Sequence, residues 1–270
     1  MAVWLQEWHH DVAYRAGWDT PCTRRNLSTK RSAEGVFELD DDQAVCEPAG
    51  TSVPVTRNRL ALLRAKVRAD FVVADRAHDF DHLERVERLA ARLADIEGCD
   101  VDLARPAALV HDYHRLDGNH GLGTAGDDGA QRASRVLETC GYSDEMISAI
   151  CACVAYTDRY QISGDALIPP SPEAAVVRDA DNLDAMGAVG VARAFAFGAV
   201  IDEPMWRPEE PHRDCYDRGV APSVIHHFYE KLLHLRDELT TSAGRNLGQA
   251  RHAEMERFVA SFEAEWLAKR

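Results

Sequence analysis

The chain has 270 residues, of which 46% are hydrophobic and 28% are charged, and its formal net charge at pH 7 is −14. The apolar fraction excludes a wholly disordered chain. The acidic balance argues against a protein that coats a nucleic acid polymer, because phosphate neutralisation needs a basic surface, but it allows a small anionic substrate in a local pocket.

The N-terminal residues, Met1 to Asp11, contain no basic segment followed by an apolar run, so no signal peptide is expected. No run of about 18 apolar residues occurs, which predicts the absence of a transmembrane helix. The seven cysteines are irregularly spaced, with one C-x-C at Cys151 and Cys153. Such spacing is typical of reduced structural thiols. We therefore expect a cytoplasmic protein with no membrane partner.

Residues 1–56 are predicted to form an irregular, loop-rich N-terminal arm. This segment contains an acidic run from Asp40 to Asp42, and its turn-forming residues include Gly17, Pro21, Pro48, Gly50 and Pro54. From residue 57 the pattern becomes helical, which predicts one helical domain over residues 57–270.

That second part is predicted to be all-α, because apolar residues recur at helical spacing and alternation typical of strands is absent. The expected helices cover residues 57–75, 79–97, 104–115, 127–140, 143–158, 172–185, 186–202, 219–239 and 243–268.

The helix predicted over residues 79–97 carries a histidine on its apolar side. At about 100° per residue, six apolar residues fall in one sector: Leu83, Val86, Leu89, Ala90, Leu93 and Ile96. His82 lies inside this sector, and His78 lies one turn earlier at its edge. Because a buried imidazole needs a partner, His82 is either a core histidine bonded to a backbone carbonyl or a ligand.

A His-Asp doublet follows the next apolar segment. Pro106 to Val110 is nearly all apolar, which indicates a buried helix with Pro106 in its first turn. It runs directly into His111 and Asp112. Imidazole and carboxylate together suit a divalent metal ion.

A carboxylate follows on a third helix. Asp181 shares a helical face with Val177, Asp184, Ala188 and Val191, so its neighbours direct it toward the core, although a helix cap or a solvated acidic turn would explain it as well.

Taken together, two imidazoles and two carboxylates on three helices can hold one divalent ion and leave positions for water and substrate. These four residues are His82, His111, Asp112 and Asp181.

The order H…HD…D on consecutive helices resembles the HD-domain superfamily of metal-dependent phosphohydrolases, in particular a branch of small bacterial hydrolases. The similar segments are Ala77–Val86, Ala108–Asp112, Arg178–Phe195, His227–Leu235 and Thr240–Arg245. The resemblance implies an HD-domain helical bundle, and it implies that His82, His111, Asp112 and Asp181 bind one divalent ion (Mn, Mg, Co, Ni, Fe or Zn).

Two regions depart from the branch. Many members carry a histidine in the loop after HD and another in a segment resembling I-x-x-H-S, and these serve a second metal in dinuclear members such as diiron oxygenases. Here the regions read Gly123 to Ala130 and Ala155 to Tyr160, so the second histidine is missing and the first survives only as a displaced His120. One metal ion is therefore expected.

A further segment, Trp8 to Tyr14 with Arg31 to Glu34, faintly resembles a fragment of a different group of HD hydrolases. Because the rest of that motif set is absent, no metal is assigned to His10 or Asp11.

Phosphate ester hydrolysis needs an activated water and a proton for the leaving oxygen. The resemblance places Asp112 next to the metal-bound water, as a ligand and a base. His78 and His114, close to the metal ligands in sequence, are the candidates for protonating the leaving group. Asp184, one turn after Asp181, would either orient a metal ligand through a hydrogen bond without binding the metal itself, or form a salt bridge within its own helix.

Arg115 is the first candidate for a phosphate clamp, because a guanidinium can hold phosphate through two hydrogen bonds. Lys231 and Arg193 are further substrate-binding candidates, with solvated surface charge as the alternative for each. These features predict a phosphohydrolase that releases phosphate from a small phosphorylated metabolite, with a nucleotide as the favoured substrate.

Two other functions stay open, an HD-type iron-dependent oxidase or lyase and a degenerate HD fold that serves as a binding module. The helix over Gly187 to Ile201 is apolar nearly all round, which fits either a buried core helix or a homodimer contact.

Overall fold

The computed structural model describes residues 55–73, 77–117, 126–157, 159–163, 168–213 and 221–269, which all belong to one compact unit, Thr51–Arg270. Apart from residues 55 and 56, the N-terminal arm predicted over residues 1–56 lies outside the described residues. So do His10, Asp11 and His120.

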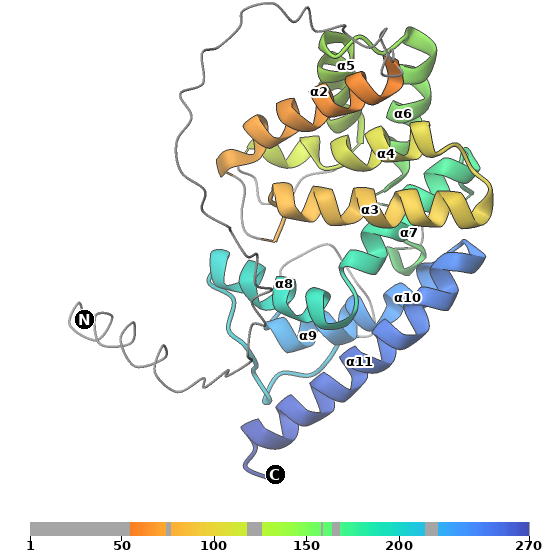
Figure 1. Cartoon of the computed structure of the whole chain (residues 1–270). Coiled ribbons are helices and arrows are strands. Elements are labelled where there is room, and N and C mark those ends of the chain that lie inside the picture. Colours follow the sequence, from red (N-terminus) through yellow and green to blue (C-terminus); the bar gives the residue numbers. More distant parts are fainter. Residues whose placement is uncertain are drawn as a thin grey trace, which may run out of the picture. The chain divides into compact units, whose positions relative to one another are not determined.

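The described residues form helices and no strand (Figure 1), so the all-α prediction is confirmed. In chain order the helices are α2 (Val55–Asp70), η1 (Phe71–Val73), α3 (Phe80–Glu97), α4 (Val101–Val110), η2 (Tyr113–Asp117), α5 (Gly126–Thr139), α6 (Asp144–Thr157), η3 (Gln161–Ser163), α7 (Pro172–Asp184), α8 (Gly187–Val200), α9 (Val224–Glu230), η4 (Leu232–His234), α10 (Leu235–Glu238) and α11 (Ser242–Trp266).

The centre of the fold is the packing of α3 against α4 and α7, and α4 and α7 also touch each other (Figure 1). Leu83 on α3, Leu109 on α4 and Leu183 on α7 are all fully buried in the same core. Each of these leucines is within two residues of a predicted metal ligand. The apolar packing of the three helices therefore brings those ligands into the interior.

Helix α3 begins and ends where its sequence provides caps. The carboxylate of Asp79 accepts a hydrogen bond from the backbone N–H of His82 at 3.1 Å, and Gly98 ends the helix with φ of 72°. Glycine adopts the left-handed backbone conformation after a helix more easily than other residues, because it has no Cβ. Because the N-cap is Asp79, His82 lies in the first turn of α3. Its side chain is fully buried in the core.

Helix α4 begins one turn earlier than the sequence indicated. The side chain of Asp100 accepts from the backbone N–H groups of Asp102 (2.8 Å) and Leu103 (3.3 Å), which starts the helix at Val101. Pro106 therefore lies inside the helix, and the prediction that it occupies the first turn was wrong. The helix ends at Val110, so the His-Asp doublet follows directly at its C-terminal end.

The single helix predicted over residues 219–239 is wrong, because the chain forms α9, η4 and α10 there. Ser223 caps α9 by accepting from the backbone N–H of His226, and Lys231 breaks the helix with φ of −136°. Lys231 consequently lies at a break between two helices.

Helices α7 and α8 meet at a bend of 71°. Gly187 adopts φ of 71°, and a Cβ on Gly190 would lie 2.2 Å from the carbonyl oxygen of Ala185, so both positions require glycine. One side of α8 packs into an aromatic cluster with α11, while Val189 and Val200 are 42% and 43% exposed. The homodimer contact stays a prediction.

No single helix in the described ranges is long and apolar enough to cross a membrane, and the bent pair α7 and α8 is the one pair there that reaches such length and composition together.

A buried ion pair fixes the segment after α6. Arg178 is fully buried, and its guanidinium donates to the carboxylate of Glu238 at 2.6 Å and to the carbonyl of Arg159 at 2.7 Å. The Glu238 carboxylate also accepts from the backbone N–H groups of Gln161 (3.0 Å) and Ile162 (2.9 Å). One carboxylate thus joins α7, α10 and η3.

We predict that Arg178→Met lowers the free energy of unfolding by about 3 to 5 kcal/mol, because it leaves the Glu238 carboxylate buried without its cation. Urea denaturation measures this change. The matched control is Arg236→Met, which breaks an exposed pair with Asp237 and should cost about 1 kcal/mol or less. Equal losses in the two variants would contradict the prediction.

Candidate metal centre

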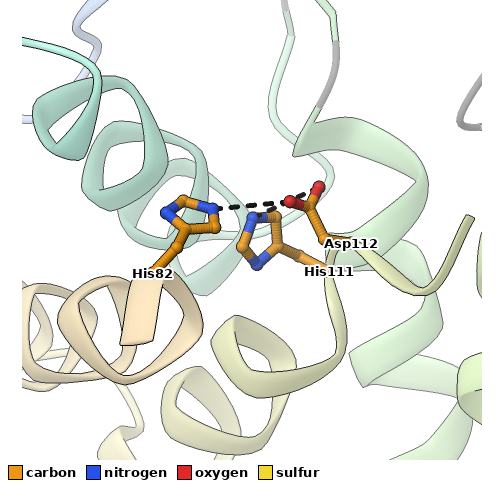
Figure 2. A group of neighbouring side chains, drawn as sticks. All are labelled: His82, His111 and Asp112. Atoms are coloured by element: carbon orange, nitrogen blue, oxygen red, sulfur yellow. Dashed lines mark ion pairs between the residues drawn. The ribbon is translucent and has the colours of Figure 1, made fainter. Parts of the chain in front are cut away.

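Three helices bring two imidazoles and two carboxylates together. Nε2 of His82 lies 3.4 Å from Oδ2 of Asp112, and Nε2 of His111 lies 3.5 Å from Oδ1 of the same carboxylate (Figure 2). Oδ1 of Asp181 lies 3.6 Å from Nε2 of His82 and 3.5 Å from Nε2 of His111. Each of the two carboxylates therefore lies close to the Nε2 atoms of both imidazoles.

The remaining hydrogen bonds fix how each ring is turned. Nδ1 of His111 lies 2.7 Å from the carbonyl oxygen of Ala108, and Nδ1 of His82 lies 2.8 Å from Oδ2 of Asp184. A carbonyl and an ionised carboxylate can only accept, so both Nδ1 atoms donate. Each neutral ring then presents the lone pair of Nε2 to the shared space, which is the form that a metal ion requires.

Three buried polar atoms in this space have no hydrogen-bond partner among the described residues: Nε2 of His82, Nε2 of His111 and Oδ2 of Asp112. Leaving such atoms unsatisfied in a protein interior is costly. One cation between them would satisfy all three.

The spacing of these atoms fits such an ion. Ligand atoms about 2.1 Å from one ion lie about 3.0 to 3.4 Å apart at adjacent coordination positions. The ligand atoms of His82, His111 and Asp112 all lie within 4.8 Å of one another, and this is the one group of three or more His, Cys, Asp or Glu of that kind in the described ranges. Asp181, whose side chain is 15% exposed and therefore nearer to solvent than the other three, is the fourth candidate ligand.

The carboxylates are held in their ionised form. Burial works against the charge of Asp112, but the guanidinium of Arg115, whose Nε lies 2.9 Å from Oδ1, and the imidazoles of His111 and His82 together hold its pKa well below the usual range. Burial likewise opposes the charge of Asp181, and the imidazole of His111, whose Nε2 lies 3.5 Å from Oδ1, keeps the pKa of that carboxyl low. Both carboxylates are therefore available as anionic ligands at neutral pH.

The same carboxylates raise the proton affinity of His111. Burial alone would lower its pKa, but Asp112 and Asp181 outweigh burial and raise the pKa of His111 to about 9. Without a metal ion, the positive charge that the two carboxylates require is supplied by this proton.

The candidate acids lie beside the centre. The ring of His78 is 5.9 Å from the ring of His82 and 5.2 Å from the ring of Phe197 on α8. Nε2 of His114 lies 4.0 Å from Oδ1 of Asp112. His78 therefore neighbours His82, and His114 neighbours Asp112.

The three predicted substrate-binding cations have different surroundings. Arg115 lies directly against Asp112. Nε of Arg193 donates to the carbonyl of Ala77 at 2.8 Å, and its Nη1 donates to Asp184 at 3.0 Å. Nζ of Lys231 lies 4.5 Å from the centroid of the Tyr160 ring. Of the three, Arg115 is the one whose described contact is a metal-ligand candidate.

Arg85 is a site residue that sequence reasoning missed. It donates twice to Asp184, from Nε at 2.8 Å and from Nη2 at 3.0 Å. The available signal was its position three residues after His82, which places both side chains near one face of α3.

Comparisons with known proteins agree with this geometry. The HD domain family model matches residues 79–186, a range that holds all four candidate ligands. The Bacillus subtilis protein YpgQ is 30% identical over 208 residues, which cover 74% of this chain and 90% of YpgQ. The chain belongs to the HD-domain superfamily. The family predicted from the H…HD…D order is thus confirmed.

Several solved structures match most of the chain. A Lactobacillus plantarum protein is 31% identical with a TM-score of 0.69, covering 79% of this chain and 99% of that protein. An HD-superfamily hydrolase from Bacillus thuringiensis is 30% identical with a TM-score of 0.60 and the same coverage. The structure of YpgQ in complex with ADP is 27% identical with a TM-score of 0.59, covering 78% and 96%.

We predict that this HD protein binds one divalent ion and that its affinity rises with pH up to about 9, because the proton on His111 competes with the ion. Below that pKa, one competing proton weakens apparent binding by up to about tenfold per pH unit. Titration calorimetry with Mn²⁺ at two pH values measures the slope.

The His111→Gln variant should bind Mn²⁺ more weakly and lose most of this pH slope. His252→Gln is the matched control, because His252 is a buried histidine on α11 outside this group, and it should keep both the affinity and the slope. A pH-independent affinity in the unmodified protein would contradict the assignment.

Proposed function

We propose that the chain is a metal-dependent phosphohydrolase that releases phosphate from a small phosphorylated metabolite, and that its substrate is a nucleotide phosphomonoester. The observation that carries the proposal is the convergence of His82, His111, Asp112 and Asp181 around three buried, unsatisfied polar atoms. A divalent ion bound there lowers the pKa of a coordinated water and polarises a phosphoryl oxygen.

The residues around the ligands suit the other requirements of this reaction. Asp112 is buried and ionised, so its carboxylate can accept the proton of the attacking water. Arg115 holds a guanidinium beside Asp112, and a guanidinium there would stabilise the charge that develops on the phosphoryl oxygens of a bound substrate. His78 lies next to His82 and His114 lies next to Asp112, so either imidazole is a candidate for donating a proton to the leaving oxygen.

Two considerations support a small nucleotide rather than a nucleic acid polymer. The net charge of −14 opposes a long polyanion. The crystal structure of the relative YpgQ contains ADP, and the aligned region covers 78% of this chain. A nucleoside phosphate is accordingly the first substrate class to test.

The oxidase or lyase alternative needs a second metal ion in the superfamily members that perform it. The described residues contain one group of ligands of the required kind, which favours hydrolysis. A binding module without catalysis is disfavoured, because both imidazoles already present Nε2 to the shared space.

We predict that phosphate release from nucleoside monophosphates requires a divalent ion, and that both a chelator and Asp112→Ala reduce it by about 100-fold or more, because each removes the activated water. A panel of nucleoside and sugar phosphates with Mn²⁺, Mg²⁺, Co²⁺ and Ni²⁺ measures free phosphate. Asp237→Ala, an exposed carboxylate on α10, is the matched control and should retain activity. Phosphate release that survives both treatments in a folded protein would refute the proposal.

The two candidate acids can be separated by the leaving group. If His114 or His78 protonates the leaving oxygen, its Gln variant should lower kcat for a nucleoside monophosphate by about 100-fold but leave p-nitrophenyl phosphate hydrolysis within a few-fold, because nitrophenolate leaves without a proton. Equal losses on both substrates would assign that histidine to another task.

A further inference from the structure

On the Nδ1 side of His82, away from the candidate metal position, Asp184 accepts hydrogen bonds from three side chains: His82, Arg85 and Arg193. Its side chain is 2% exposed. Oδ2 accepts from Nδ1 of His82 (2.8 Å), from Nη2 of Arg85 (3.0 Å) and from Nη1 of Arg193 (3.0 Å), and Oδ1 accepts from Nε of Arg85 (2.8 Å). Four hydrogen bonds from two helices, α3 and α8, fix this carboxylate in one orientation.

We propose that Asp184, clamped by Arg85 and Arg193, is a positioning residue that holds His82 in its Nδ1–H tautomer and so directs Nε2 to the metal ion. This inference rests on the proposed metal centre, and it assigns Arg193 to that clamp instead of to substrate binding.

The two arginines fix the orientation of this carboxylate. Arg85 donates to both of its oxygens and Arg193 donates to Oδ2, so Oδ2 is held 2.8 Å from Nδ1 of His82. A carboxylate can only accept, so Nδ1 of His82 is the donor and its Nε2 carries the lone pair that a metal ion requires.

Arg193 also couples this clamp to the candidate acid. Its Nε donates to the carbonyl of Ala77, the residue before His78. The His78 ring packs edge-on against Phe197, one turn after Arg193 on α8. Helix α8 thus contacts both Asp184, which bonds Nδ1 of His82, and the segment that carries His78.

Mn²⁺ affinity of the purified full chain tests the proposal. Asp184→Asn is expected to weaken Mn²⁺ binding by about 10- to 100-fold, because an amide cannot accept from His82 and both arginines together. Arg193→Met is expected to weaken it by a smaller factor. Glu84→Gln is the matched control. Glu84 lies on α3, the helix of His82, and it forms ion pairs with Arg64 and Arg68 on α2. Because the substitution leaves the contacts of Asp184 in place, it should keep the affinity.

A second readout separates positioning from mere stabilisation. Long-range ¹H–¹⁵N correlation spectra of the histidine-labelled, metal-free protein report the tautomer of His82, which should be Nδ1–H in the unmodified chain and mixed in Asp184→Asn. An unchanged tautomer and unchanged Mn²⁺ affinity in a folded Asp184→Asn variant would overturn the proposal, even if its melting temperature falls. Because neither readout uses phosphate release, failure of the proposed hydrolysis leaves this test intact.

Discussion

The structure depends on burying two histidines and several carboxylates in the middle of an apolar helical core. Removing such groups from water is unfavourable unless each finds a partner. Here α3, α4 and α7 pack through leucines that are next to the polar residues in sequence, so the core cannot form without bringing those groups together. The hydrogen bonds to Ala108 and Asp184 satisfy one side of each imidazole. The other side is left to a cation.

The four ligand candidates could be read from sequence because the signal for each is local. His82 and Asp181 stand on apolar helical faces, and His111 with Asp112 ends an apolar segment. Such periodicity gives the direction of a side chain without knowledge of its tertiary neighbours. The family order H…HD…D then links the three local signals.

The partners of the cations could not be read in this way. Arg193 was predicted to bind substrate, but its described contacts are with Asp184 and Ala77, which depend on how α8 packs against α7 and α3. The break at Lys231, where φ is −136°, is a change in backbone direction that helical periodicity does not encode. Pro106 misled the prediction because Asp100 caps α4 one turn earlier.

Three carboxylates on α7 illustrate how neighbours divide the work among identical side chains. Asp181 and Asp184 are three residues apart and lie about 60° apart around the helix, so both face α3, one toward Nε2 and the other toward Nδ1 of His82. Asp179 points elsewhere and accepts from the backbone and hydroxyl groups of Thr240 and Thr241. Burial raises its pKa despite those bonds and the positive charge of Arg178. The helix therefore carries a candidate ligand, a proposed positioning group and a structural anchor. What distinguishes the three is which groups the opposing helices place against each carboxylate.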